Sequence, residues 1–246
     1  MIFSPSEHVE RIGNYRNIMN NIFFVSGIDT GVGKTVATGL MARYLLGRGV
    51  KTATVKLVQT GNVGYSEDRD EHRRLMGRPL PEDETCLTAP QIFAFPGSPH
   101  LAAKLENRTV EVEKLRNACR ELSRRYDAVL AEGAGGLAVP LTEDLLTADF
   151  AAEMKLPLIL VASGKLGSLN HTILSLECAA ARKMRLLGIV FNYSPDADPV
   201  IDADSEMMMR KYLGKYGFPP VVVRLPKVGE TLPEVDFSPI FRQVLP

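Results

Sequence analysis

The chain has 246 residues, of which 29 are basic and 29 acidic, so its formal net charge at pH 7 is zero. This balance argues against a nucleic-acid partner, and three cysteines without metal-ligand spacing argue against a disulfide framework or a zinc site. No apolar run approaches the roughly 20 residues of a membrane span, and the polar first residues lack the apolar core of a secretory signal. We therefore expect a cytoplasmic protein that binds neither nucleic acid nor membrane.

The pattern along the chain divides it into two parts. Residues 1–20 are predicted to be an N-terminal extension, either a passive tail or a short helix around 7–15. Residues 21–246 are predicted to form one domain, with strands at 22–26, 52–56, 128–132, 158–162, 187–191 and 221–225. Amphipathic segments between them predict helices at 34–46, 110–125, 169–183 and 199–212. Apolar strands separated by helices predict a mostly parallel sheet with helices on both faces.

A glycine-rich turn, GIDTGVGKT, joins the first predicted strand to the first predicted helix. Small residues such as Gly31 and Gly33 let backbone N–H groups close around a polyphosphate, and the helix adds its positive amino end. Lys34 is placed to reach the β- and γ-phosphates, and the Thr35 hydroxyl to ligate Mg²⁺. The pattern predicts a nucleotide user with a single-domain, P-loop NTPase-like α/β fold. A plain turn with a surface lysine is the alternative.

Polar residues also follow the second and third predicted strands, where ligands of parallel sheets bind. Lys56 is suited to hold a carboxylate and a transferring phosphate; the alternative is a lysine that reaches solvent. Glu132 is suited to ligate Mg²⁺, and the glycines after it let backbone approach a ligand; the alternative is a tight turn with an exposed glutamate. Asp68 begins a polar helix-like run and is either an N-cap or a further metal ligand.

Five segments in a fixed order make the pattern specific. They are 27–35, 56–61, 98–100, 132–136 and 165–171, and together they resemble the dethiobiotin synthetase family over most of residues 21–226. Five residues separate Gly27 from Gly33, against four in a general nucleotide loop, and this spacing suits the family.

The chain departs from the family's pattern at two positions. Leu57 stands where proline is common, and Gly31 stands where some members carry glutamate, so no side-chain role is carried over to position 31. Residues 1–20 lie outside the resemblance.

The resemblance implies a reaction. The family uses ATP, Mg²⁺ and CO₂ to close a ureido ring on 7,8-diaminopelargonic acid, which yields dethiobiotin in biotin biosynthesis. A substrate amine captures CO₂ as a carbamate, the carbamate attacks the γ-phosphate, and the second amine closes the ring and expels phosphate. The enzyme of this family is a homodimer, and its task is mostly positioning and charge stabilisation.

The resemblance also implies residue roles. The catalytic set is Lys34, Lys56 and Thr30. The residues expected to contact ATP, the last two beside the adenine, are Gly31, Val32, Gly33, Lys34, Thr35, Glu132, Gly133, Ala134, Gly135, Asn192 and Pro226. The expected Mg²⁺ ligands are Thr35, Asp68 and Glu132, with Asp70 in place of Asp68 as a fallback. The expected substrate contacts are Thr60, Leu166, Gly167 and Asn170, the last three receiving the carboxylate tail across the dimer interface.

Other interpretations remain beside this one. His100 and His171 are expected to be structural, because substrate or phosphate can accept protons directly. An amidating synthetase of the cobyrinic-acid type shares the stretched loop but usually carries a further glutamine-hydrolysing domain. A partitioning-type switch ATPase typically has a lysine early in the loop, where this chain has Ile28-Asp29-Thr30. A non-enzymatic nucleotide-binding module would leave Lys56 and Glu132 unexplained.

Overall fold

The six predicted strands form one parallel sheet in the computed structural model, which describes residues 21–193, 198–229 and 231–242. The strand order is β2-β5-β1-β6-β7-β8. The bounds are β1 Ile22–Gly27, β2 Thr52–Lys56, β5 Ala128–Gly136, β6 Leu158–Ser163, β7 Leu186–Asn192 and β8 Val222–Leu225. The predicted extension, residues 1–20, lies outside the described residues.

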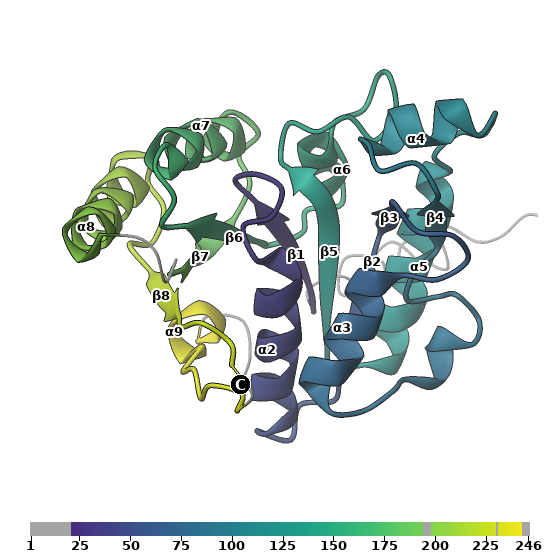
Figure 1. Ribbon diagram of the computed structural model, residues 1–246, viewed down its shortest axis with the longest axis horizontal. Helices are drawn as coiled ribbons and strands as arrows, with labels where there is room; N and C mark the ends of the chain where they lie inside the picture. Colours follow the sequence, from purple (N-terminus) through teal and green to yellow (C-terminus); the bar gives the residue numbers. More distant parts are fainter. Residues whose placement is uncertain (1–20, 194–197, 230, 243–246) are drawn as a thin grey trace, which may run out of the picture.

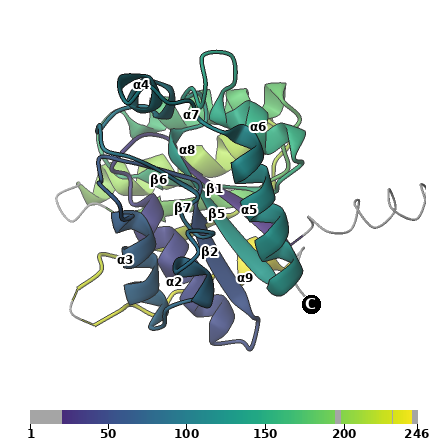
Figure 2. The ribbon, with the colours of Figure 1, turned by 90° about the vertical axis from the view of Figure 1, so that its right-hand side faces the viewer.

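Helices cover both faces of this sheet. Helices α2 and α3 lie on one face and α5 on the other, as Figures 1 and 2 show from two sides. The helices are α2 Lys34–Leu46, α3 Glu67–Met76, α4 Pro99–Leu105, α5 Val112–Arg125, α6 Thr147–Glu153, α7 Ser168–Ala181, α8 Pro199–Lys215 and α9 Ser238–Phe241. The predicted α/β class and the predicted long helices are confirmed, with ends shifted by a few residues.

The central strands are buried because their apolar side chains are covered from both sides. Every residue of β1 and of β6 is buried, and Phe23 and Phe24 are fully inaccessible to solvent. Burial on both faces explains why the sequence shows continuous apolar runs here rather than alternation. The rigid sheet fixes the positions of the loops at its carboxyl edge.

The sequence did not predict a second, smaller sheet. Strands β3 (Val58–Thr60) and β4 (Gln91–Phe93) pair in parallel beside the end of β2, and a 3₁₀ turn spans Pro81–Asp83. Three-residue strands carry too little periodicity to stand out in a sequence. Within the described ranges, no helix has the length and apolar character that a membrane crossing requires.

Candidate active site

The predicted phosphate loop connects β1 to α2 and is held by a residue from β7. Gly33 has φ of +92°, a left-handed conformation that favours glycine. A Cβ there would lie 2.3 Å from Nδ2 of Asn192, whose amide donates to the carbonyl of Val32 at 3.0 Å. The loop therefore has a fixed shape, and the amino end of α2, with its unpaired N–H groups, lies directly after it.

Lys34, the first residue of α2, folds back over the loop. Its side chain is buried, and Nζ donates to the carbonyl of Asp29 at 2.9 Å. Burial, together with the nearby charge of Lys56, lowers the pKa of Lys34. A Cβ on Gly27 would lie 3.0 Å from Nζ and 2.7 Å from that carbonyl, so glycine at position 27 leaves room for the lysine.

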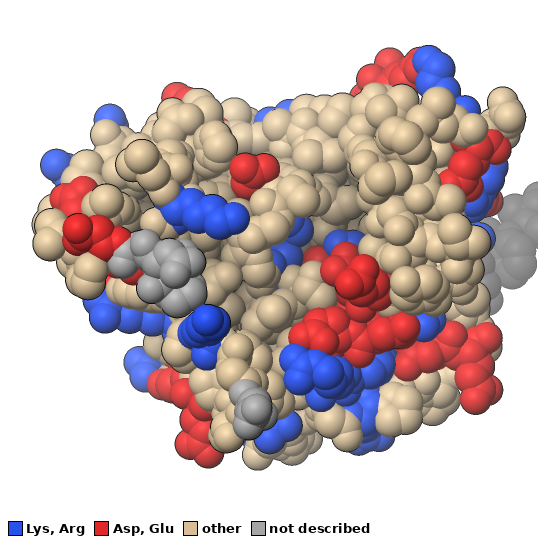
Figure 3. Space-filling view, viewed as in Figure 1, with Lys and Arg blue, Asp and Glu red and all other residues tan. Residues whose placement is uncertain are grey.

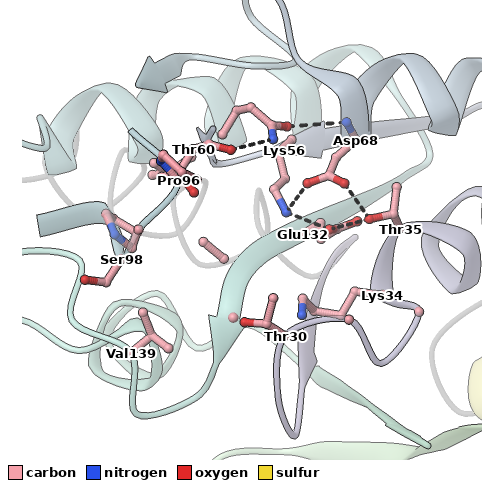
Figure 4. A pocket seen from close by; sticks show the side chains of 18 of the residues that line it. Thr30, Lys34, Thr35, Lys56, Thr60, Asp68, Pro96, Ser98, Glu132 and Val139 are labelled. Carbon is pink, nitrogen blue, oxygen red and sulfur yellow. Dashed lines mark hydrogen bonds and ion pairs between the residues drawn. The ribbon is translucent and has the colours of Figure 1, made fainter. Parts of the chain in front are cut away.

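Five polar side chains form what we call the site cluster: Thr35, Lys56, Asp68, His72 and Glu132. The sheet register pairs Lys56 of β2 with Glu132 of β5, and Lys56 Nζ lies 2.7 Å from both Glu132 Oε1 and Asp68 Oδ2. The Thr35 hydroxyl lies 2.7 Å from Asp68 Oδ1 and 3.1 Å from Glu132 Oε1. Figure 4 shows Thr35, Lys56, Asp68 and Glu132 pointing toward one another.

Charge pairing overcomes burial in this cluster. Burial alone would raise the pKa of the fully buried Glu132, but Lys56 and His72 hold it well below its usual range. Burial alone would lower the pKa of Lys56, but Glu132 and Asp68 raise it. Glu132 and Lys56 are therefore both ionised at neutral pH. Their burial, with Glu132 0% and Lys56 5% exposed, excludes the predicted alternatives of an exposed turn glutamate and of a lysine that reaches solvent.

Helix α3 carries Asp68 into the cluster, and a serine caps that helix. Ser66 is the N-cap and accepts from the backbone N–H of Arg69 at 3.2 Å, while its own hydroxyl donates to Gln59. The N-cap alternative for Asp68 is therefore wrong. The fallback residue, Asp70, pairs with Arg69 at 2.7 Å with a half-exposed side chain, so Asp68 and not Asp70 faces Lys56.

A cavity of about 720 Å³ opens beside the site cluster. Figure 3 shows the molecular surface hollowed above α3, where acidic and basic side chains meet. Pro96, Ser98 and Val139 line the cavity together with the phosphate loop and the site cluster. This is large enough for a small ligand, and its floor holds both cations and carboxylates.

Most of the predicted site residues lie around this cavity. Those that line it are Thr30, Gly31, Gly33, Lys34, Thr35, Lys56, Thr60, Asp68, Glu132, Ala134 and Gly135. The Gly133 carbonyl accepts from Lys56 at 3.2 Å. Gly133 itself does not line the cavity, and neither do six other predicted residues, Val32, Leu166, Gly167, Asn170, Asn192 and Pro226.

These six other residues fall into two groups. Val32 and Asn192 bond to each other and support the loop. Leu166 is 93% exposed, Gly167 is the N-cap of α7, and Asn170 and Pro226 lie at the surface. None of these four surface residues lines the cavity beside the site cluster.

Of the three histidines that the structure describes, the one in the site cluster, His72, is the one that sequence analysis missed. His72 is fully buried, and its Nε2 lies 2.8 Å from Glu132 Oε2. The signal was its position four residues after Asp68, on the same face of a helix. His100 does not line the cavity, and His171 is half exposed, 3.6 Å from Asp29.

Comparison with known proteins places this chain in a family. A family model described as an AAA domain matches residues 21–234. The chain is 45% identical to ATP-dependent dethiobiotin synthetase BioD 2 of Pasteurella multocida over 199 residues, which are 80% of this chain and 93% of that protein. It is 47% identical to dethiobiotin synthetase BioD of Chlorobaculum tepidum over 80% of this chain and 83% of that one. The chain belongs to the dethiobiotin synthetase family.

Membership of this family confirms the resemblance, the predicted ligase class and the predicted use of ATP. Among solved structures, the ParA family ATPase from Chlorobium tepidum TLS is similar with a TM-score of 0.50, at 16% identity over 86% of each chain. At that identity the likeness confirms the predicted P-loop NTPase-like fold and gives no support to the switch-ATPase alternative.

Proposed function

We propose that this chain converts 7,8-diaminopelargonic acid, CO₂ and ATP into dethiobiotin, ADP and phosphate, as a step of biotin biosynthesis. Family membership supports the proposal. The observation that carries it is the convergence of Lys34, Lys56 and two carboxylates on one cavity after a phosphate loop. Phosphoryl transfer to an anionic acceptor needs this combination of cations and metal ligands.

The proposed reaction has three steps. One substrate amine attacks CO₂, loses a proton and becomes a carbamate. A carbamate oxygen then attacks the γ-phosphorus of ATP, which releases ADP and leaves a carbamic–phosphoric anhydride. The second amine attacks the anhydride carbon, loses a proton and expels phosphate, which carries away the carbamate oxygen that bridged carbon and phosphorus.

Two lysines and Thr30 perform the proposed catalytic roles, and Thr60 is a proposed substrate contact. Lys34 bridges the γ-phosphate and the carbamate, two anions that would otherwise repel each other. Lys56 holds the carbamate and the transferring phosphoryl group, and its raised pKa keeps it charged while it does so. Thr30 and Thr60, both in the lining of the cavity, contact the carbamate and the diamine.

The site cluster fits a magnesium ion. Thr35, Asp68 and Glu132 offer the oxygen ligands that a hard cation prefers. No three His, Cys, Asp or Glu side chains of the described residues form a metal cage on their own, so the ion would need further oxygen ligands from outside the chain. When bound, Mg²⁺ would supply positive charge against the phosphates. Asp68 and Glu132 would hold it, and Lys56 balances one of their two negative charges.

The remaining predicted contacts belong to the nucleotide and to a second copy of the chain. The backbone of Gly31 to Gly33 and of Gly133 to Gly135 cradles the phosphates, and Asn192 and Pro226 flank the adenine. Leu166, Gly167 and Asn170 receive the substrate's carboxylate tail in the cavity of a partner subunit. Their surface position supports this role, as does the amino end of the 14-residue helix α7, which suits an anion.

One incubation tests the proposal. Purified protein with ATP, Mg²⁺, bicarbonate and 7,8-diaminopelargonic acid should form dethiobiotin, detected by mass, with one ADP per product. Omitting the diamine should suppress both products. Absence of dethiobiotin from protein that binds ATP would refute the proposed reaction and leave the fold and the nucleotide site standing.

A further inference from the structure

One contact of Glu132 is not used by the proposed reaction. His72 Nε2 lies 2.8 Å from Glu132 Oε2, and both side chains are completely inaccessible to solvent. The ionised carboxylate only accepts hydrogen bonds, so Nε2 carries the proton and donates it. The other ring nitrogen, Nδ1, has no partner among the described residues. The contact with Glu132 is therefore the one hydrogen bond that the described structure gives this ring.

The two oxygens of Glu132 have different surroundings. Oε2 is bound by His72, whereas Oε1 lies 2.7 Å from Lys56 Nζ and 3.1 Å from the Thr35 hydroxyl. The histidine thereby leaves Oε1 to the side of the cluster that carries the lysine and the loop threonine. Without a donor at Oε2, a buried carboxylate oxygen would be unpaired, which is costly, and the carboxylate would be free to rotate toward other donors.

Helix α3 delivers two groups to the site cluster at once. Asp68 and His72 are four residues apart and lie on one face of the helix, one turn from each other. Asp68 contacts Lys56 and Thr35 directly, whereas His72 reaches the same pair only through Glu132. One turn of α3 thus provides both Asp68, which contacts Lys56 and Thr35, and His72, which contacts Glu132.

We infer that His72 is a positioning residue for Glu132: it holds Oε2 so that Oε1 faces the magnesium ion and Lys56. The inference rests on the proposed magnesium site. Outer partners of metal ligands act in this way, and their loss typically lowers metal affinity about 10- to 100-fold. His72 touches neither substrate nor metal in this role.

Two amide substitutions separate positioning from simple packing. The amide nitrogen of glutamine can occupy the place of Nε2, whereas that of asparagine falls near Nδ1, where none of the described residues accepts a hydrogen bond. His72→Gln therefore keeps the donor to Glu132, and His72→Asn removes it while keeping an amide. Both variants are prepared as full-length chains, and a thermal melt verifies folding.

Calorimetric titration of Mg²⁺ into protein saturated with a non-hydrolysable ATP analogue gives the readout. We expect His72→Asn to weaken Mg²⁺ binding at least about tenfold and His72→Gln to stay within about threefold of the native chain. Affinity for the analogue without metal should be the same in all three proteins, because His72 acts only through the metal ligand.

Equal Mg²⁺ affinity in the two variants would overturn the inference. So would a matching loss of metal-free nucleotide affinity, or the failure of both variants to fold, since either would assign His72 to packing alone. The measurement is independent of turnover. A chain that makes no dethiobiotin but shows the Gln/Asn difference would refute the proposed reaction and keep the positioning role.

Discussion

Two neighbouring residues of α3, His72 and Arg73, belong to two charge clusters that differ in kind. His72 joins the site cluster. Arg73 joins what we call the brace cluster, which consists of Thr54, Arg73, Asp83 and Thr88. Both clusters contain ion pairs with N–O distances of 2.7 Å, so the distances alone do not tell a functional cluster from a structural one.

The brace cluster satisfies its own charges. Arg73 donates from Nε and Nη2 to the two oxygens of Asp83, at 2.8 and 2.7 Å, and from Nη1 to Thr54 at 2.6 Å. Asp83 also accepts from the Thr88 hydroxyl and from the backbone N–H of Leu80. The single cation, Arg73, is paired with the single anion, Asp83. The brace cluster does not line the cavity beside the site cluster.

In the site cluster, by contrast, carboxylates outnumber lysines. Two carboxylates, Asp68 and Glu132, meet one paired lysine, Lys56, at the edge of a cavity of about 720 Å³. Asp68 keeps 27% of its side chain exposed. An excess of negative charge facing an accessible space suits a cation, whereas a saturated pair suits only stability. Charge balance and access, rather than ion-pair geometry, separate the two roles.

The largest expected effect is on turnover. Lys34→Ala and Lys56→Ala should each reduce the rate of dethiobiotin formation by at least about 10²-fold, because in the proposed reaction each removes a cation from the transferring phosphoryl group. Lys51→Ala, at the exposed position directly before β2, the strand that ends in Lys56, is the matched control and should stay within about twofold. Near-normal turnover in Lys56→Ala would remove its role.

The brace cluster should respond to acid. Burial opposes the charge of Asp83, but hydrogen bonds from Arg73 and Thr88 lower its pKa from 3.8 to about 2. A pKa lowered by folding contributes stability above the unfolded value and loses it as pH falls. We expect about 2 kcal/mol of unfolding free energy to disappear between about pH 5 and pH 2 in the native chain but not in Asp83→Asn.

Urea unfolding at several pH values measures this difference. Asp144→Asn, at an exposed loop position, serves as the control and should follow the native chain. Parallel pH profiles of the native chain and Asp83→Asn would show that the brace does not stabilise the fold through its ion pair.

A smaller effect should distinguish two aspartates of α3. Asp68→Asn should raise the Mg²⁺ concentration needed for half-maximal activity about tenfold, because it removes the charge of a proposed Mg²⁺ ligand from the site cluster. Asp70→Asn, two residues away and paired with Arg69 at the surface, should leave the Mg²⁺ dependence unchanged. Equal responses would mean that the charge of the helix, not a specific ligand, attracts the metal.

The sequence predicts those structural features that depend on local residue patterns. Buried parallel strands leave long apolar runs, and ligands collect at the carboxyl ends of such strands, so the sheet and the places of Lys56 and Glu132 follow from the chain itself. For Asp68 the sequence leaves two interpretations, because an N-cap and a metal ligand look alike in sequence; in the structure Ser66 is the cap.

The sequence does not predict features that depend on contacts between residues far apart in the chain. The partner of His72 is 60 residues further along the chain, and strands β3 and β4 have three residues each. Helical position alone does not reveal that a histidine lies behind a buried carboxylate. The roles of Leu166, Gly167 and Asn170 stay predictions, since they concern a second copy of the chain.

The fate of oxygen from CO₂ tests the central claim most directly. With ¹⁸O-labelled bicarbonate, diamine, ATP and Mg²⁺ in a brief incubation, mass spectrometry of the released phosphate should find one ¹⁸O per molecule, since the carbamate oxygen that attacks phosphorus leaves with it. The ureido carbonyl of dethiobiotin should carry a second label. Dethiobiotin formed together with unlabelled phosphate would contradict phosphorylation of a carbamate in this site.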